Sequence, residues 1–132
     1  MVIAVLDACA VIAFFRDEKG AEVVTRSLYT ETCIIHAVNL AEVYLDALRR
    51  GESQDEANEL VHNLVRLSVG VRTDLDPAFW KRVAQIKAQG GIAFADCFAL
   101  ALAERVRGKL LTADGEMRKF AESGAFEIQF IR

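Results

Sequence analysis

Four acidic side chains stand alone in apolar surroundings, and they are the residues of this sequence best suited to chemistry. They are Asp7, Glu42, Asp96 and Asp114. Burying a carboxylate is costly unless a cation, a hydrogen-bond donor or a ligand compensates it. Carboxylates that are brought close together repel one another and need a cation between them. Their oxygens favour Mg²⁺ or Mn²⁺, and the sequence has neither a zinc-type Cys/His set nor an EF-hand loop.

Asp7 and Asp114 each follow a short apolar segment that is typical of a buried strand. Asp7 comes directly after residues 2–6, and Asp114 comes two residues after the segment 109–112. An aspartate between a strand and a helix can also be a helix N-cap, and Thr112 is either a competing cap or a supporting hydroxyl. Both interpretations stay open for the two aspartates.

Asp96 and Glu42 lie in segments of helical spacing. Residues 92–103 are apolar on all sides apart from Asp96, which predicts a helix that is buried over most of its surface. Asp96 can also be an early-helix acid that the helix dipole favours, or the partner of a distant arginine. Glu42 has no basic residue three or four positions away, whereas Asp46 can pair with Arg49 or Arg50. A solvated helix face is the alternative for Glu42.

Alternating strands and helices are expected to position these acids. Strands are predicted at 2–6, 33–36, 70–73, 109–112 and 127–131, with helical segments between them, in the order strand, helix, strand, helix, helix, strand, helix, helix, strand, helix, strand. Among the helices are 38–50, one that begins near Gln54, one that opens at Asp76-Pro77, and 95–107. This alternation predicts a three-layer α/β/α sandwich with a mostly parallel sheet. Its functional site should lie at the carboxyl ends of the strands, where the four acids converge.

Composition narrows the class of protein. The 132 residues suit one domain covering 1–132, and the net charge of −3 gives no global attraction to nucleic acid, so any RNA binding must be local. Three cysteines, an odd number within apolar segments, fit a reduced cytoplasmic protein. We expect no export signal and no membrane span, because the apolar segments are too short.

The four acids and their neighbours resemble the PIN-domain family, and within it the VapC-type toxins of toxin–antitoxin systems. Val5-Leu-Asp7 is similar to the family's first strand and first acid, and Val38-Asn-Leu-Ala-Glu42 to its helical glutamate. Ala95-Asp96 resembles the third acid, and Leu111-Thr-Ala-Asp114 the closing Thr-x-Asp motif. The four motifs occur in family order and span nearly the whole chain. Cys9 and His36 depart from the pattern, since the family often has hydroxyl residues there.

The resemblance implies a metal-dependent ribonuclease. Asp7, Glu42, Asp96 and Asp114 would bind Mg²⁺ or Mn²⁺, which would engage a phosphate oxygen of RNA and position a hydroxide for in-line attack. Asn39 and Thr112 would support the acids from outside the ligand set. The resemblance also implies a homodimer that is inhibited by a small antitoxin, a segment of which lies along the active-site groove. No role is expected for His62, on the predicted helix that begins near Gln54.

Other contacts and other functions stay open. Candidate contacts to the RNA backbone are Arg16, Lys19, Arg49, Arg50, Lys81, Arg82, Lys87 and Arg118, each of which can also be a solvated surface residue. Aromatic residues that are either core or part of a partner surface are Phe14, Phe15, Tyr29 and Tyr44. One alternative function is a phosphate-transferring α/β enzyme that uses Asp7, although Cys9 stands where a haloacid-dehalogenase-like phosphatase has a second aspartate. The other is a non-catalytic interaction module.

Overall fold

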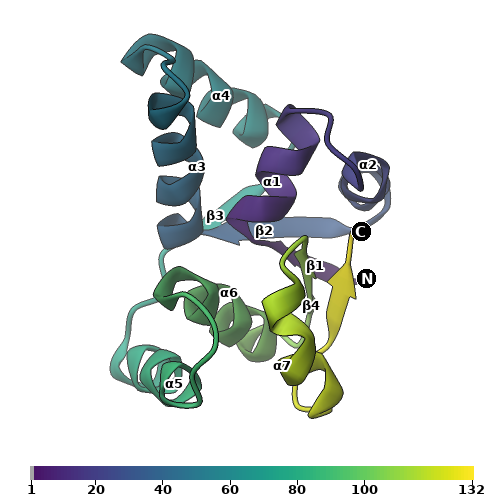
Figure 1. Ribbon diagram of the computed structural model, residues 1–132, viewed down its shortest axis with the longest axis vertical. Helices are drawn as coiled ribbons and strands as arrows, with labels where there is room; N and C mark the ends of the chain where they lie inside the picture. Colours follow the sequence, from purple (N-terminus) through teal and green to yellow (C-terminus); the bar gives the residue numbers. More distant parts are fainter. Residues whose placement is uncertain (1) are drawn as a thin grey trace.

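A five-stranded parallel sheet lies at the centre of the computed structural model, which describes residues 2–132 (Figure 1). The strand order is β3-β2-β1-β4-β5, and every pairing between neighbouring strands is parallel. The strands are β1 (Ile3–Leu6), β2 (Thr32–His36), β3 (Gly70–Arg72), β4 (Lys109–Thr112) and β5 (Ile128–Phe130). The central strands are buried because they are apolar on both faces, as a sheet covered on both sides requires.

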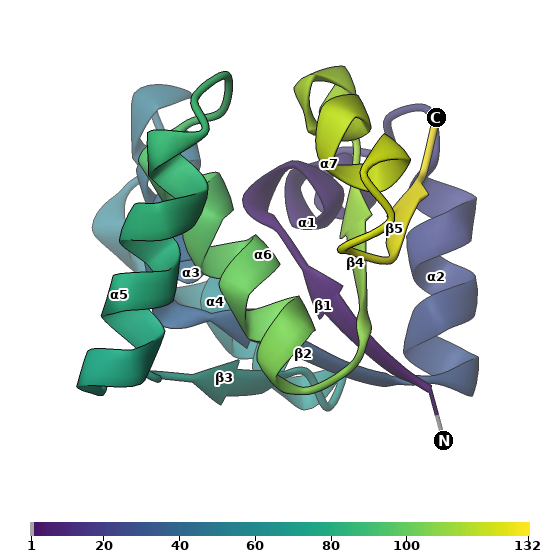
Figure 2. The same ribbon diagram turned by 90° about the horizontal axis from the view of Figure 1, so that it is seen from below.

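Two layers of helices cover the sheet. The helices are α1 (Ala8–Phe15), α2 (Ala21–Thr30), α3 (Ala37–Arg49), α4 (Gln54–Arg66), α5 (Pro77–Ala88), α6 (Phe94–Arg105), the short 3₁₀ helix η1 (Gly115–Met117) and α7 (Arg118–Glu122). Helices α1 to α4 pack on one face, where Leu6 meets Val11 and Val43; α5 to α7 pack on the other, where Val5 meets Leu100 (Figures 1 and 2). The predicted α/β/α sandwich is therefore confirmed.

The segment between β1 and β2 differs from the single helix that was predicted. It contains two helices, α1 and α2, because the chain turns sharply at residues 16–20. Asp17 has a φ of 53° and Gly20 a φ of 97°, values that a continuing helix does not allow. A side chain at Gly20 would also lie 2.6 Å from the carbonyl oxygen of Ile131. The other expected elements are present, with ends displaced by one or two residues.

Strand β1 occupies the point at which the strand order reverses. The chain runs outwards from β1 to β3 and then returns to β4 on the other side of β1. Leu6 lies in register with Leu111, and the backbone N–H of Asp7 donates to the Leu111 carbonyl oxygen at 3.3 Å. In open parallel sheets, ligands bind in the crevice beyond the carboxyl ends of the strands at such a point. Asp7 and Asp114 both follow strands that end there.

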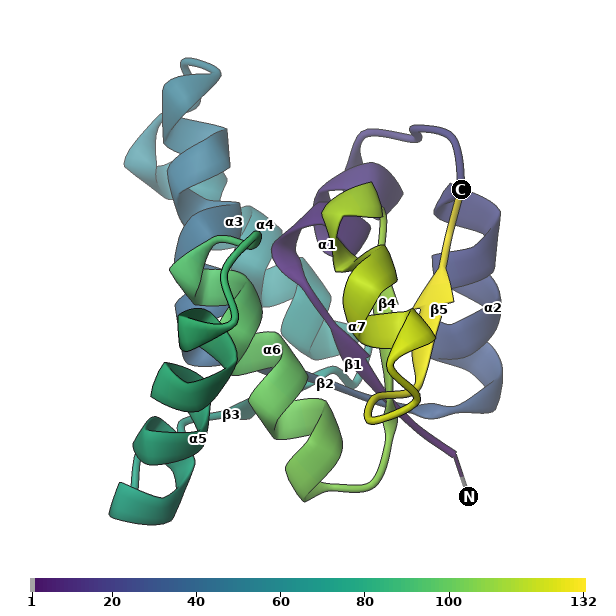
Figure 3. The ribbon, with the colours of Figure 1, turned by 60° about the horizontal axis from the view of Figure 1, so that its bottom comes forward.

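Helices α3 and α4 form a hairpin that extends beyond the edge of the sheet (Figure 3). The helix expected to begin near Gln54 is confirmed, and Ser53 caps it and exchanges hydrogen bonds with Glu56 in a capping box. No helix within residues 2–132 is long and apolar enough to cross a lipid bilayer.

Candidate active site

Asp7 is fully buried at the junction between β1 and α1. Its Oδ1 atom accepts a hydrogen bond from the backbone N–H of Ala10 at 2.9 Å, so the helix-cap interpretation is correct for that oxygen. The Oδ2 atom is buried and has no hydrogen-bond partner among residues 2–132. A cap therefore accounts for half of this carboxylate, and the other oxygen is left for a ligand.

Asp114 occupies the equivalent position after β4. Its Oδ1 atom accepts a hydrogen bond from the N–H of Glu116 at 2.9 Å and so caps η1. Its own backbone N–H donates to the hydroxyl oxygen of Thr112 at 3.0 Å. Thr112 is fully buried and holds the turn that carries Asp114.

Asp96 lies in the first turn of α6 and is 8% exposed. The helix dipole favours a carboxylate at this position. The predicted alternative of a distant arginine is not realised within the described residues, because no ion pair involves Asp96. Arg105, at the other end of α6, instead binds Asp74 and Asp76. Asp96 is thus a nearly buried acid without a cationic partner.

Three of the four acids face one surface hollow of about 330 Å³. Glu42 reaches it from α3, Asp96 from α6, and Asp114 from the turn after β4. The remaining wall residues are Ala8, Cys9, Ile12, Leu45, Asp46, Arg49 and Ala93. We call this the acidic hollow. Asp7 is close enough for its charge to interact with those of Asp96 and Asp114.

The electrostatics of the acidic hollow oppose ionisation of its acids. Burial, with smaller contributions from the charges of Asp96 and Asp114, raises the pKa of Asp7 to about 7, although the nearby Thr112 hydroxyl and the hydrogen bond from Ala10 limit the rise. Burial also raises the pKa of Asp96 to about 6, and the charges of Asp114 and Glu42 add to the effect. Burial raises the pKa of Glu42 as well. A cation bound among these groups would relieve both the burial cost and the repulsion.

The available donor atoms are of the chemical type that a hard divalent cation prefers. Carboxylate oxygens are the ligands that Mg²⁺ and Mn²⁺ prefer, and the buried Oδ2 atom of Asp7 has no other partner in the described chain. Within residues 2–132, no three Asp, Glu, His or Cys side chains are placed so as to hold a metal ion between them. Mg²⁺ usually keeps several waters and takes one or two carboxylates together with substrate phosphates, so a closed protein cage is not required.

Comparison with known proteins assigns the fold to a family. The model of the PIN domain matches residues 4–123. The chain belongs to the PIN-domain family. A search of curated protein sequences gives no significant match.

Several solved structures share the fold of this chain at low sequence identity. The chain superimposes on one from VapBC-1 of nontypeable Haemophilus influenzae with a TM-score of 0.73 and 17% identity, covering 98% of each chain. The superposition on a chain of DNA-bound VapBC from Salmonella typhimurium has a TM-score of 0.73 and 14% sequence identity, and it covers 100% of each chain. The superposition on a chain of FitAcB from Neisseria gonorrhoeae has a TM-score of 0.63 and 19% sequence identity, and it covers 95% of each chain.

His36, a departure from the usual PIN pattern, is a structural residue. It is buried, and its Nδ1 atom accepts a hydrogen bond from the N–H of Val38 at 3.0 Å, which caps α3. Because Nδ1 accepts, Nε2 carries the proton and donates to the carbonyl oxygen of Asp74 at 2.9 Å. The ring also stacks on Phe79 at 5.4 Å. Both ring nitrogens of His36 therefore have hydrogen-bond partners.

Several residues that line or adjoin the acidic hollow were not assigned to the site from the sequence. Cys9 is exposed in its wall, and Leu45 and Arg49 face it from α3. Glu116 adds negative charge near Asp96. Spacing on α3 could have indicated Leu45 and Arg49, because they lie three and seven residues after Glu42, on one helix face. Asp46 pairs with Arg50 at 2.9 Å, as one of the two expected options, and also with Arg16 at 3.5 Å.

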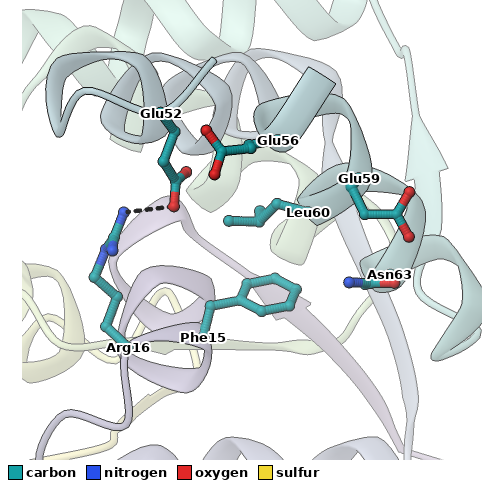
Figure 4. A pocket seen from close by; sticks show the side chains of 7 residues that line it. All are labelled: Phe15, Arg16, Glu52, Glu56, Glu59, Leu60 and Asn63. Atoms are coloured by element: carbon teal, nitrogen blue, oxygen red, sulfur yellow. Dashed lines mark ion pairs between the residues drawn. The ribbon is translucent and has the colours of Figure 1, made fainter. Parts of the chain in front are cut away.

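A second hollow of about 280 Å³ lies next to the first, between the end of α1 and α4 (Figure 4). Phe15 and Leu60 face each other across it, and Glu52, Glu56 and Glu59 stand around its rim. Arg16 lines this hollow and pairs with Asp46, which lines the acidic hollow. The two hollows are therefore adjacent, and the ion pair between Arg16 and Asp46 separates them.

Proposed function

We propose that this PIN-domain protein is a metal-dependent endoribonuclease and the toxin of a type II toxin–antitoxin pair. The observation that carries the proposal is the convergence of Glu42, Asp96 and Asp114 on one hollow, beside a buried Asp7 with an unpartnered oxygen. Ionised carboxylates clustered in this way repel one another, and a bound cation would relieve that repulsion. PIN-family membership and likeness to chains from VapBC complexes support the nuclease and toxin assignments.

The chain's own residues would bind and orient a divalent ion and the RNA. Asp96 and Asp114 would hold Mg²⁺ or Mn²⁺ at the rim of the acidic hollow, with Asp7 and Glu42 completing the negative site. When bound, the ion would supply Lewis-acid stabilisation of the phosphodiester and lower the pKa of bound water. Thr112 would fix the turn that carries Asp114. Full burial of Asp7 argues against its use as a covalent phosphate acceptor, because such a nucleophile must reach its substrate.

A cleavage assay tests this function. The purified protein is incubated with mixed single-stranded RNAs in Mn²⁺, with EDTA as the metal-free reference. We expect cleavage that EDTA abolishes and that Asp7→Asn or Asp96→Asn lowers at least about 100-fold. Asp55→Asn is the matched control, because Asp55 is an exposed acid of α4. Unchanged cleavage by Asp96→Asn would overturn the metal site.

Metal titration separates an enzyme from a non-catalytic module. An ion that binds only the folded state raises the melting temperature. We expect Mg²⁺ or Mn²⁺ to stabilise the wild-type protein and Asp55→Asn, and to leave Asp96→Asn nearly unaffected. If the acids were only helix caps, neither ion would shift the melting temperature of any of the three proteins.

We further propose that a segment of the cognate antitoxin occupies the second hollow and extends towards the acidic hollow. Phe15 and Leu60 would receive an apolar side chain, and the glutamates of the rim would attract basic residues. The product of an adjacent short reading frame is the probe, co-expressed and co-purified with this protein. We expect Leu60→Asp to weaken retention, whereas the exposed control Val65→Asp leaves it intact.

The proposed assembly is a homodimer. Its support is the exposed apolar surface of α3, α5 and α6, where Leu45, Leu48, Trp80 and Phe94 are 36–52% exposed. Light scattering on the purified protein tests the dimer. A monomer at all accessible concentrations would contradict it.

A further inference from the structure

Only one of the basic residues considered as RNA contacts faces the acidic hollow. Arg16 and Arg82 are held in ion pairs, and Lys87 donates to the carbonyl oxygen of Ile92. Arg118 lies over the ring of Phe130. Arg49, by contrast, lines the acidic hollow together with three of the four acids.

Arg49 is exposed, and its side chain has no hydrogen bond or ion pair within residues 2–132. Its nearest acidic neighbour on the same helix face, Asp46, is already bound to Arg50 and Arg16. The C-terminal end of α3 attracts positive charge through the helix dipole. The helix dipole acts equally on Arg50 and Arg49. It therefore does not explain why Arg49, whose guanidinium is unpaired, lines the acidic hollow.

The position of Arg49 fits a contact beside the reacting group. Glu42 and Arg49 are seven residues apart, which is about 10 Å along a helix. Leu45, which is 42% exposed, lies between them and contributes an apolar side chain to the lining of the acidic hollow. A strand of RNA entering this site meets mostly negative side chains, so its flanking phosphates need a cation apart from the metal. Arginine suits that task, because its planar guanidinium donates two parallel hydrogen bonds to a phosphate.

We propose that Arg49 binds a phosphate of the RNA that flanks the scissile phosphodiester, and so holds the strand across the acidic hollow. This inference rests on the proposed ribonuclease function and adds one substrate-binding residue to it. It assigns Arg49 to affinity for any single-stranded RNA and gives it no part in sequence preference, because phosphate contacts are shared by all sequences.

Binding measurements test the proposal without cleavage. A short fluorescein-labelled single-stranded RNA of mixed sequence is titrated with Asp96→Asn protein over a series of KCl concentrations. Adding Arg49→Ala to this background is expected to weaken binding roughly tenfold at low salt. It should also reduce the slope of log affinity against log salt by about 0.7, the value for one phosphate contact on a single strand. Arg50→Ala is the matched control and should keep the slope, because Arg50 is engaged by Asp46.

Kinetics and assembly give the remaining outcomes. In the Asp96-containing protein, Arg49→Ala should raise KM and leave kcat nearly unchanged, and Arg49→Lys should recover part of the loss. An unchanged salt slope in Arg49→Ala overturns the inference. So does a change in oligomeric state with no change in RNA affinity, which would assign Arg49 to a protein interface. The ribonuclease proposal is tested separately by the cleavage assay, and it fails if the wild-type protein does not cleave RNA.

Discussion

The side-chain amide of Asn39 on α3 donates a hydrogen bond to the carbonyl oxygen of Ala95 at 3.3 Å, one residue before Asp96. Asn39 is fully buried, and this bond ties the helix that carries Glu42 to the helix that carries Asp96. The resemblance implied a supporting role for Asn39, which stays a prediction, and this hydrogen bond is the contact through which we expect it to act.

Asn39→Ala should therefore loosen the site. The substitution removes this hydrogen bond and leaves a cavity at a fully buried position, so we expect the free energy of unfolding to fall by about 2 kcal/mol. Urea unfolding measures this change, and Mn²⁺-dependent cleavage should fall as well. Asn58→Ala is the control, since Asn58 is exposed on α4. Equal effects of the two substitutions would show that the Ala95 contact has no special role.

Raised pKa values in the acidic hollow predict that the metal-free protein loses stability as pH rises. Asp7, with a pKa of about 7, and Asp96, with a pKa of about 6, keep their protons in the folded state at pH values where the unfolded chain has released them. The folded state then binds more protons than the unfolded state, so the free energy of unfolding decreases between about pH 4 and pH 7. For Asp7 the decrease is on the order of 4 kcal/mol.

Urea unfolding in EDTA at several pH values checks this prediction. The curve for Asp7→Asn should be shallower than that of the wild type, because the main titrating group is absent, and the residual slope should come from Asp96. Saturating Mg²⁺ should reduce the decrease in the wild type by favouring the ionised acids. Stability that rises with pH in EDTA would contradict the assignment.

His36 predicts a stability effect that is separate from catalysis. His36→Ala removes the cap of α3 and the hydrogen bond to Asp74, so we expect the free energy of unfolding to fall by about 2 kcal/mol. His36→Asn should recover part of this loss, because asparagine is a good N-cap. The measurement is urea unfolding, with His62→Ala on the exposed face of α4 as the control. Indistinguishable midpoints for the two alanine variants would rule out the capping role.

Lys119 predicts an effect on the loop that precedes Asp96. Its ammonium group donates to the carbonyl oxygens of Gln89 and Gly90, and it thereby links α7 to the loop between α5 and α6. Lys119→Met should speed amide hydrogen exchange in residues 89–93 and lower kcat/KM severalfold, because Ala93 forms part of the acidic hollow. Lys81→Met, on the exposed side of α5, should change neither quantity. Unaltered exchange in Lys119→Met would refute this role.

Much of this arrangement could be predicted because its signals are local. An apolar strand followed by an isolated acid marks Asp7 and Asp114, and an acid in an otherwise apolar helix marks Asp96. Parallel strand order then brings these positions to one edge of the sheet. The assignment of these residues as metal ligands stays a prediction that the cleavage and titration experiments address.

The remainder depends on contacts between distant segments, which spacing does not encode. The break between α1 and α2 rests on the backbone conformation of Asp17 and on the packing of Gly20 against Ile131. Arg16 pairs with Asp46 across two helices, which leaves Arg49 unpaired. Sequence alone offered Arg49 as one basic residue among several, and only the folded chain distinguishes it.

The reversal of strand order at β1 also bears on when the protein becomes able to act. β1 and β4 are neighbours in the sheet, but they are far apart in the sequence, and β1 is synthesised first. A nascent chain on the ribosome therefore holds Asp7 long before Asp114 and the second wall of the site exist. Pairings between distant parts of a chain form late and slowly. The proposed ribonuclease would therefore be unable to act before the segment that carries Asp114 has been synthesised and has paired with β1.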